Sequence, residues 1–554
     1  MENLGKVERK IIVGIDFGTT YSGLAYAQTL NPDHHFPIDS WPSSLEIDET
    51  VSCAKVPTQI RYIPQGTQWG FQIPSIVDRH QWFKLGLEEG HAVSEGEQSS
   101  PEVLTRAYLA KLYDYLMATL ERKVGTETLQ NTPMEFYLTV PAIWTEAAKD
   151  KTLGAFRAAR PDAAAFIVSE PEAAAVYALQ GLDPHELTVG DSFVLCDAGG
   201  GTVDLISYTI IALRPILKVR EATIGTGDLC GASFLNRRFA ELITRKLGQE
   251  PGWDDEVLAD AMERFETVKV AYSAANQDGY RVPVPGLADN PDLGVRRGRY
   301  KISPSEMREI HEPIIAGIIE LVQRQISDAG RAIKAVLLVG GFGENNHLRE
   351  RLQMSLDGIE VLQPANAWTS VVRGAVMMGM SRADASLSAL IVESRAARKN
   401  YGVELLVLYN AARHSAEKRY WCARHQQFKA AEMKWFIRKG DAVEEMQPHD
   451  INFVFTTPVM KCRPESLKID VWSDSESAQA PVHKTDTVRK LATLVADLSH
   501  MTTADLQSTI VTLADGHQYF SIPGCIEATF YSAWTRYVLL CQGNRYDTVT
   551  AEYA

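Results

Sequence analysis

The chain has 554 residues, of which 45% are hydrophobic, enough to build several large cores. Its formal net charge of −14 argues against nucleic-acid partners, because the phosphate backbone of DNA or RNA demands positive charge. The seven cysteines form no C-x-x-C pair and no close group with histidine, which argues against a zinc site and for a reducing compartment.

No apolar stretch approaches the roughly 20 residues that span a bilayer. The N-terminal segment Met1–Lys10 is charged and lacks the apolar region of a signal peptide. We therefore expect a cytoplasmic protein with no membrane partner.

Strands and helices are expected to alternate from Ile11 to about Met380, the pattern of an α/β architecture. Apolar runs predict strands, and apolar residues at three- and four-residue steps predict helices. The predicted strands are Ile11–Ile15, Gln59–Ile63, Phe136–Val140, Ala164–Val168, Phe193–Asp197, Val203–Ile211 and Ala335–Val339. The predicted helices are Leu104–Leu120, a stretch from Pro141 to Ala159, one opened by Pro171, and Ser233–Leu247. The pair His34-His35 is expected in a solvated loop.

From about Tyr401 the chain changes to short β-like runs separated by polar turns. The runs are Val403–Tyr409, Ile451–Thr456, Leu467–Val471, Thr509–Leu513, Ile526–Tyr531 and Arg536–Cys541. They predict a small β-sandwich-like domain over residues 401–554. Residues 386–400 are expected to link it to the preceding domain, and the apolar patch Leu390-Ile391-Val392 within them fits a buried strand or an exposed linker equally.

Two short segments about 180 residues apart repeat one pattern, Ile15–Thr20 and Cys196–Thr202. In each, an apolar strand ends in an aspartate that is followed by glycine and threonine. Glycine permits a tight turn whose amide N–H groups approach phosphate oxygens. An aspartate tolerates a neighbouring phosphate only beside a divalent cation, so Asp16 and Asp197 indicate magnesium. Either segment alone is as easily a plain turn after a core strand, but the duplication favours a clamp on a nucleotide triphosphate.

Together with the two aspartate turns, four further motifs occur in a distinctive order along the chain: Val140–Ala142, Ser169–Ala175, Gly225–Gly231 and Leu338–Gly343. Gly225–Gly231 is predicted to form a glycine-rich turn before a helix, and Leu338–Gly343 is predicted to form a strand that ends in glycines. With the two aspartate turns, they resemble the nucleotide-binding domain of the heat-shock protein 70 chaperone family, within the actin-like ATPase superfamily. The resemblance implies a duplicated, bilobed, ribonuclease H-like domain over residues 8–385 that binds ATP/ADP with Mg²⁺.

The resemblance also implies roles for individual residues. Asp16 and Asp197 correspond to the aspartates that hold Mg²⁺ through water. The implied catalytic residues are Asp16, Lys84, Glu170, Asp197 and Thr202. The implied nucleotide contacts are Gly18, Thr19, Thr20, Tyr21, Gly199, Gly200, Gly201, Gly227, Glu266, Lys269, Ser273, Gly340, Gly341 and Phe342. An ordinary surface lysine is nearly as good an interpretation of Lys84. Glu266, Lys269 and Ser273 share one helical face, which would be interpreted as a solvated surface if the neighbouring motifs were absent.

Three positions depart from the family pattern. Val270 replaces an arginine that stacks on adenine, Phe342 replaces a serine, and Trp368 replaces an acidic residue. A lost cation–π contact weakens binding by about tenfold, so adenine specificity is expected to be weaker than phosphate binding.

The C-terminal region resembles the family's peptide-binding β domain only faintly, through segments such as Tyr401–Val403 and Phe436–Gly440. No helical lid is expected after it, although a lidless β domain still binds extended peptide by edge pairing.

We therefore expect an ATP-hydrolysing chaperone-like protein that couples nucleotide state to the β domain, with extended peptides and co-chaperones as partners. One alternative is a nucleotide-sensing scaffold, a pseudo-ATPase that barely hydrolyses. The other is a small-molecule kinase of the same superfamily, which would use Asp204 or Asp228 as its base.

Overall fold

The structure is a computed structural model. It describes residues 7–43, 49–74, 77–88, 99–181, 187–214, 216–388, 390–445, 447–461, 463–499, 501–541, 544–546 and 550–553. The chain divides into two compact units, Met1–Ile391 and Val392–Ala554. The boundary falls inside strand β20 (Leu390–Ala396), so the apolar patch Leu390-Ile391-Val392 is a strand rather than an exposed linker.

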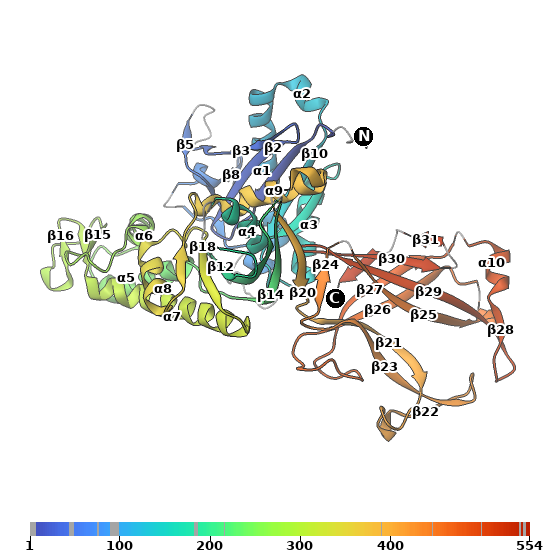
Figure 1. Cartoon of the computed structure of the whole chain (residues 1–554). Helices are drawn as coiled ribbons and strands as arrows, with labels where there is room; N and C mark the ends of the chain where they lie inside the picture. The colour runs from blue at the N-terminus through green and yellow to red at the C-terminus, as the bar shows by residue number, and fades with distance from the viewer. Residues whose placement is uncertain are drawn as a thin grey trace. The chain divides into compact units, whose positions relative to one another are not determined.

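The first unit contains a sheet built around the strand that carries Asp16 (Figure 1). Its path is β11 (Ala164–Ser169), β10 (Met134–Val140), β1 (Ile11–Asp16), β2 (Tyr21–Gln28) and β3 (Asn31–Pro37). Strand β1 runs parallel to β10 and antiparallel to β2. The turn between β1 and β2 therefore follows Asp16 directly.

A second sheet of the same unit repeats this arrangement around Asp197. Its strands in this unit are β19 (Glu360–Leu362), β18 (Ile333–Val339), β12 (Ser192–Ala198), β13 (Val203–Ala212) and β14 (Leu217–Asp228). Strand β12 runs parallel to β18 and antiparallel to β13. Both aspartates thus lie where a central strand turns back into its hairpin partner, and the predicted α/β architecture is confirmed.

Helix α9 (Ser370–Ala383) packs tightly against α4 (Glu170–Gly181) and β1 (Figure 1). Glycine permits the close approach: a Cβ at Gly374 would overlap the carbonyl oxygen of Ala173, and one at Gly14 would lie 2.6 Å from that of Val372. The start of α9, next to Trp368, is therefore fixed against the first sheet.

The remaining helices of the first unit cover the two sheets. Helices α1 (Pro101–Val124) and α3 (Glu146–Ala159) pack on each other, and α2 (Thr126–Gln130) follows α1. Around the second sheet lie α5 (Ser233–Leu247), α6 (Asp255–Val270), α7 (Pro304–Asp328) and α8 (Asn346–Ser355). Short strands complete the unit: β4 (Ser40–Pro42), β5 (Thr50–Ser52), β6 (Val56–Pro57), β7 (Gln59–Ile63), β8 (Gly66–Trp69), β9 (His80–Gln81), β15 (Tyr280–Pro283), β16 (Val295–Arg296) and β17 (Arg299–Ile302).

The second unit consists mainly of strands. One sheet contains β22 (Tyr420–Cys422), β23 (Gln427–Ile437), β21 (Asn400–Leu408), β26 (Ser466–Asp474), β27 (Arg489–Asp497) and β32 (Thr550–Tyr553). The other contains β25 (Pro448–Pro458), β29 (Gln518–Phe530), β30 (Thr535–Cys541), β31 (Asn544–Tyr546) and β28 (Ile510–Thr512). Strand β24 (Ala442–Glu444) pairs with β20, and α10 (Thr503–Ser508) is a short helix. Buried side chains of both sheets, such as Val471 and Ile526, share one core, so the two sheets pack face to face.

Three sequence-based expectations were wrong. His34 and His35 lie in strand β3, which pairs with β2, and not in a loop. The glycine-rich turn before α5 is shorter than predicted, because Gly225–Asp228 is the end of β14. Helix α6 ends at Val270, so Ser273 does not continue its face. Among the helices of the described residues, none combines the length and apolar character that a membrane crossing requires.

Candidate functional site

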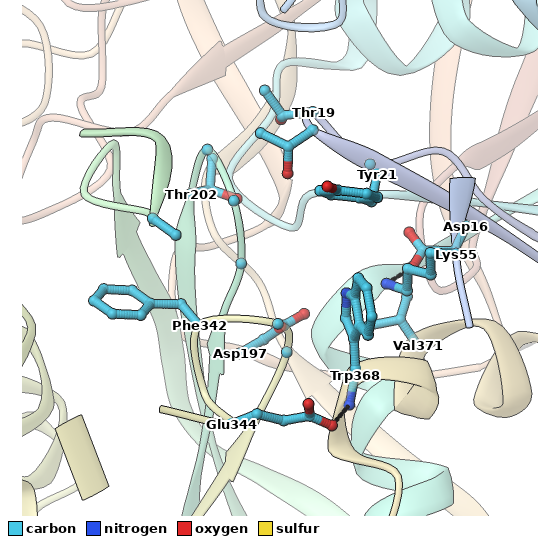
Figure 2. A pocket seen from close by; sticks show the side chains of 18 of the residues that line it. Asp16, Thr19, Tyr21, Lys55, Asp197, Thr202, Phe342, Glu344, Trp368 and Val371 are labelled. Atoms are coloured by element: carbon cyan, nitrogen blue, oxygen red, sulfur yellow. Dashed lines mark hydrogen bonds and ion pairs between the residues drawn. The ribbon is translucent and has the colours of Figure 1, made fainter. Parts of the chain in front are cut away.

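A cavity of about 350 Å³ lies where the two aspartate-bearing strands end, a size typical of small-molecule sites (Figure 2). It gathers all but two of the residues that the sequence pointed to. The predicted residues that line it are Asp16, Gly18, Thr19, Thr20, Tyr21, Lys84, Glu170, Asp197, Gly199, Gly200, Gly201, Thr202, Glu266, Lys269, Gly340, Gly341 and Phe342. The structure therefore brings together residues that are up to 326 positions apart in the chain.

The two glycine turns touch each other. A Cβ added at Gly200 would overlap the hydroxyl oxygen of Thr20, and one added at Gly201 would lie 2.7 Å from that of Thr19. Any side chain at these glycines would push the turns apart. The contact thus requires glycine in the second turn and places threonines of the first turn opposite it.

The second turn is held in place by the segment that leads into α5. The backbone N–H of Ser233 donates to the carbonyl of Gly200 at 2.8 Å, and that of Gly231 donates to Gly201 at 3.2 Å. A Cβ at Gly231 would also lie 2.5 Å from the Gly200 backbone. By contrast, Gly227 belongs to β14 and does not line the cavity. Gly231, rather than Gly227, is therefore the glycine that supports the turn.

The glycine pair after β18 closes over Asp197. Gly340 has a φ of +87°, and a Cβ there would overlap both Asp197 Oδ1 and the carbonyl oxygen of Ala198. The N–H groups of Phe342 and Gly343 donate to that carbonyl at 2.9 and 3.1 Å. Glycine is required at position 340 by its left-handed backbone and by the lack of space.

Lys84 is a buried residue of the cavity wall and not a surface lysine. Its side chain is almost fully enclosed, at 1% exposure, and its Nζ lies 2.6 Å from Glu170 Oε1. The same ammonium group lies 5.6 Å from the ring of Phe17 and 5.2 Å from that of Trp144. The ion pair and the rings together fix its position beside Glu170.

Lys55 is the site residue that the sequence analysis missed. Its Nζ lies 2.5 Å from Asp16 Oδ2, and both side chains are buried in the cavity wall (Figure 2). Asp16 Oδ1 also accepts a hydrogen bond of 3.3 Å from Thr139. A single lysine before the short strand β6 belongs to no motif, so nothing in the local sequence pointed to it.

The carboxylates of the cavity are poorly solvated. Burial raises the pKa of Glu170 to about 7, although the ammonium group of Lys84 opposes the shift. Burial, reinforced by the negative charge of Glu170, raises the pKa of Asp197 well above its ordinary range. Grouped carboxylates of this kind call for a cation, and their hard oxygen ligands suit Mg²⁺. No group of three or more His, Cys, Asp or Glu side chains in the described part of the chain is arranged to bind a metal directly, so a metal here would also need water or ligand oxygens.

The other end of the cavity carries a small polar network. Lys269 Nζ lies 2.7 Å from Glu266 Oε2 and 2.9 Å from Asn236 Oδ1, and Asn236 also donates to Glu266. Ser273 lies outside the cavity, where its hydroxyl accepts from the N–H of Ala275. Two residues of this predicted trio therefore line the cavity, and the third does not.

Aromatic side chains form the wall beside this network. The ring of Trp368 meets that of Tyr21 edge-on, with the ring centroids 5.5 Å apart, and the backbone N–H of Trp368 donates to Glu344 Oε1 at 3.0 Å (Figure 2). Phe342 lines the cavity nearby, while Val270 is 63% exposed at its rim. All three departures from the family pattern thus border this end of the cavity.

Comparison with known families is decisive. A family model described as Hsp70 protein matches residues 83–386, more than half of the chain. The chain belongs to the Hsp70 family. This confirms the resemblance drawn from its motifs, and membership implies the actin-like ATPase fold. The matched range contains the second glycine turn, while the first turn and Lys55 precede it.

Three relatives of this Hsp70 family member each share less than 30% sequence identity with it. Human heat shock 70 kDa protein 12B is 23% identical in an alignment 541 positions long, with 76% of each chain covered. Human heat shock 70 kDa protein 12A is 23% identical over 511 residues, with 74% of each chain covered. Chaperone protein DnaK of Buchnera aphidicola subsp. Schizaphis graminum (strain Sg) is 29% identical over 231 residues, or 40% of this chain and 34% of that protein. A second model, a domain of unknown function (DUF8568), matches residues 395–508 of the β unit.

Proposed function

We propose that this Hsp70 family member binds ATP or ADP with Mg²⁺ in the cavity, hydrolyses ATP, and acts as a chaperone-like protein through its β unit. The observation that carries the proposal is the contact between the two glycine turns, Gly200 against Thr20 and Gly201 against Thr19. Backbone amides and threonine hydroxyls that converge from two sheets form a cradle for a chain of phosphates. The two sheets are then the halves of one duplicated, bilobed domain.

The charged side chains of the cavity have separate roles in nucleotide binding and in hydrolysis. Lys55 and Lys84 bring positive charge to the phosphates, and Asp16 and Asp197 would hold Mg²⁺ through water. When bound, Mg²⁺ neutralises part of the charge on the phosphate oxygens. Thr202 adds a hydroxyl donor from the second turn.

Hydrolysis uses Glu170 and Lys84. A water molecule attacks the γ-phosphorus in line with the bond to the β–γ bridging oxygen, and that bond breaks to release ADP and phosphate. Glu170 accepts the proton of the attacking water, a role that suits a carboxyl with a pKa of about 7. Lys84, 2.6 Å from Glu170, keeps this carboxylate oriented and offsets the charge that develops on the phosphoryl oxygens.

The β unit is proposed to bind extended peptides, with co-chaperones as further partners. Support comes from large apolar side chains exposed on its first sheet, including Leu406, Leu408 and Trp421, which are 59%, 61% and 50% exposed. Trp421 also meets Phe428 edge-on at 5.0 Å. Exposed apolar groups are typical of interaction surfaces, and Trp421 lies on the edge strand β22, where a peptide can be added as a further strand.

The test combines single-turnover hydrolysis with peptide titration of the full chain. We expect stoichiometric conversion of ATP to ADP with Mg²⁺, and peptide affinities that differ between the ATP- and ADP-bound states. Equal peptide affinity in both states would refute the coupling.

A second candidate is a nucleotide-sensing scaffold that binds ATP without significant turnover. It is favoured by the ion pair between Lys55 and Asp16, because this lysine already occupies one oxygen of an aspartate on the metal side. Binding of ATP without release of phosphate over many hours would support this candidate.

A further inference from the structure

Lys55 is built into the phosphate end of the cavity by packing as well as by charge. A Cβ added at Gly23 would lie 3.4 Å from Lys55 Cγ, so the lysine stem lies over the glycine of β2. Its side chain is 8% exposed and that of Asp16 is 5% exposed. The ammonium group is thus held in one place with little water around it.

The buried charges of the cavity form two separate pairs. Lys84 neutralises Glu170, and Lys55 neutralises Asp16. Among the described residues, Asp197 has no ion-pair partner. A divalent cation that enters this site therefore finds one aspartate unpaired and the other already joined to an ammonium group (Figure 2).

We infer that Lys55 is a resident cation of the phosphate site, which presents its ammonium group to the nucleotide phosphates and takes over part of the charge neutralisation that Mg²⁺ supplies. The inference rests on the proposed nucleotide binding. A lysine ammonium is a compact point charge that binds phosphate oxygens well. Nucleotide binding accordingly keeps most of its strength when divalent cations are removed, and Asp197 remains the main contact of the metal.

A merely structural role for Lys55 makes a different prediction. If Lys55 only neutralises a buried Asp16, its loss lowers the stability of the fold and weakens binding equally with and without Mg²⁺. The ratio of the ADP dissociation constant in EDTA to that in millimolar Mg²⁺ separates the two roles, because a general loss of stability does not move it.

The experiment measures this ratio by calorimetric titration of the full chain with ADP. We expect a ratio below about 10 for the wild type, because Lys55 stays in place when the metal is removed. Lys55→Met keeps the packed stem but loses the charge, and should raise the ratio to about 100 or more. Lys55→Arg should stay near the wild type. The matched control is Lys334→Met, which removes an exposed lysine paired with Asp191 and should leave the ratio unchanged.

Equal ratios for the wild type and Lys55→Met would overturn the inference, as would a wild type that binds no ADP in EDTA but binds it in Mg²⁺. If Lys55→Met does not fold, the wild-type ratio still decides, together with the double variant Asp16→Asn/Lys55→Met, which leaves no lone buried charge and should also show a high ratio. Absence of ADP binding by the wild type in Mg²⁺ would refute the proposed nucleotide site itself, and the inference with it.

Discussion

The two ends of the cavity are built in different ways. At the phosphate end, glycine backbone packs directly against threonine side chains and neighbouring backbone, and four buried charges form two ion pairs. At the other end, side chains form the cavity surface, with an exposed Val270 at the rim and Trp368 packed against Tyr21. Backbone contacts tolerate almost no substitution, whereas rim side chains vary at small cost. If the proposed function holds, phosphate recognition is the fixed property of this protein and base preference the adjustable one.

The largest effect is expected from removal of the Glu170 carboxylate at the phosphate end of the cavity. Glu170→Gln should lower single-turnover ATP hydrolysis by about 100- to 1,000-fold, because the proton of the attacking water loses its acceptor. ATP affinity should change far less, as measured by calorimetry. The matched control is Glu320→Gln, which alters an exposed pair with Arg324 on α7 and should leave the rate unchanged. An unaltered rate in Glu170→Gln would show that no specific catalysis occurs here.

The contact between Gly200 and the Thr20 side chain is tested by adding one methyl group to the glycine. Gly200→Ala should weaken ATP binding by about 100-fold and destabilise the fold by about 1–3 kcal/mol, because the new Cβ overlaps Thr20. The control is Gly154→Ala inside α3, where a Cβ meets nothing within 4 Å and should stabilise the helix by about 0.5–1 kcal/mol. ATP titration and chemical denaturation measure both variants. Retained affinity in Gly200→Ala would contradict the cradle formed by the two turns.

A pH profile sharpens the assignment of Glu170. Burial raises its pKa to about 7, and only the ionised carboxylate accepts a proton. The hydrolysis rate should therefore rise about tenfold per pH unit below pH 7 and level off above it. The same profile measured on Glu170→Gln should be flat. A wild-type rate that does not vary between about pH 5.5 and 8.5 would remove Glu170 from the chemistry.

Smaller effects are expected at the end of the cavity that contains Val270 and Trp368. Val270→Arg places a cation at the exposed rim and should raise ATP affinity by about tenfold, because the guanidinium can stack on the base. Ser273→Ala is the matched control and should have no effect, since Ser273 lies outside the cavity. A loss of affinity in Ser273→Ala as large as the gain in Val270→Arg would mean that this end is wrongly assigned.

Sequence alone predicted what depends on local pattern. The strands that carry Asp16 and Asp197 were predictable, since an apolar run that ends in glycine is a local signal. Lys55 was not, because its pairing with Asp16 joins residues 39 positions apart through tertiary structure.

The errors have equally physical reasons. His34 and His35 follow Asn31, Pro32 and Asp33 in an edge strand, and such a polar segment is typical of a loop when its pairing with β2 is not known. Ser273 was placed on the α6 face because its spacing fits a helix. The helix ends at Val270, and two residues later Tyr272 packs into the core with its ring centroid 4.2 Å from that of His311.

The most direct test of the account is a calorimetric titration of the full chain with ATP, GTP and adenosine, each in the presence of Mg²⁺. If the phosphate end dominates binding, ATP and GTP should bind at one site with affinities within about tenfold of each other, and adenosine should bind at least about 1,000-fold more weakly. Adenosine that binds as tightly as ATP, or ATP that does not bind at all, would contradict it.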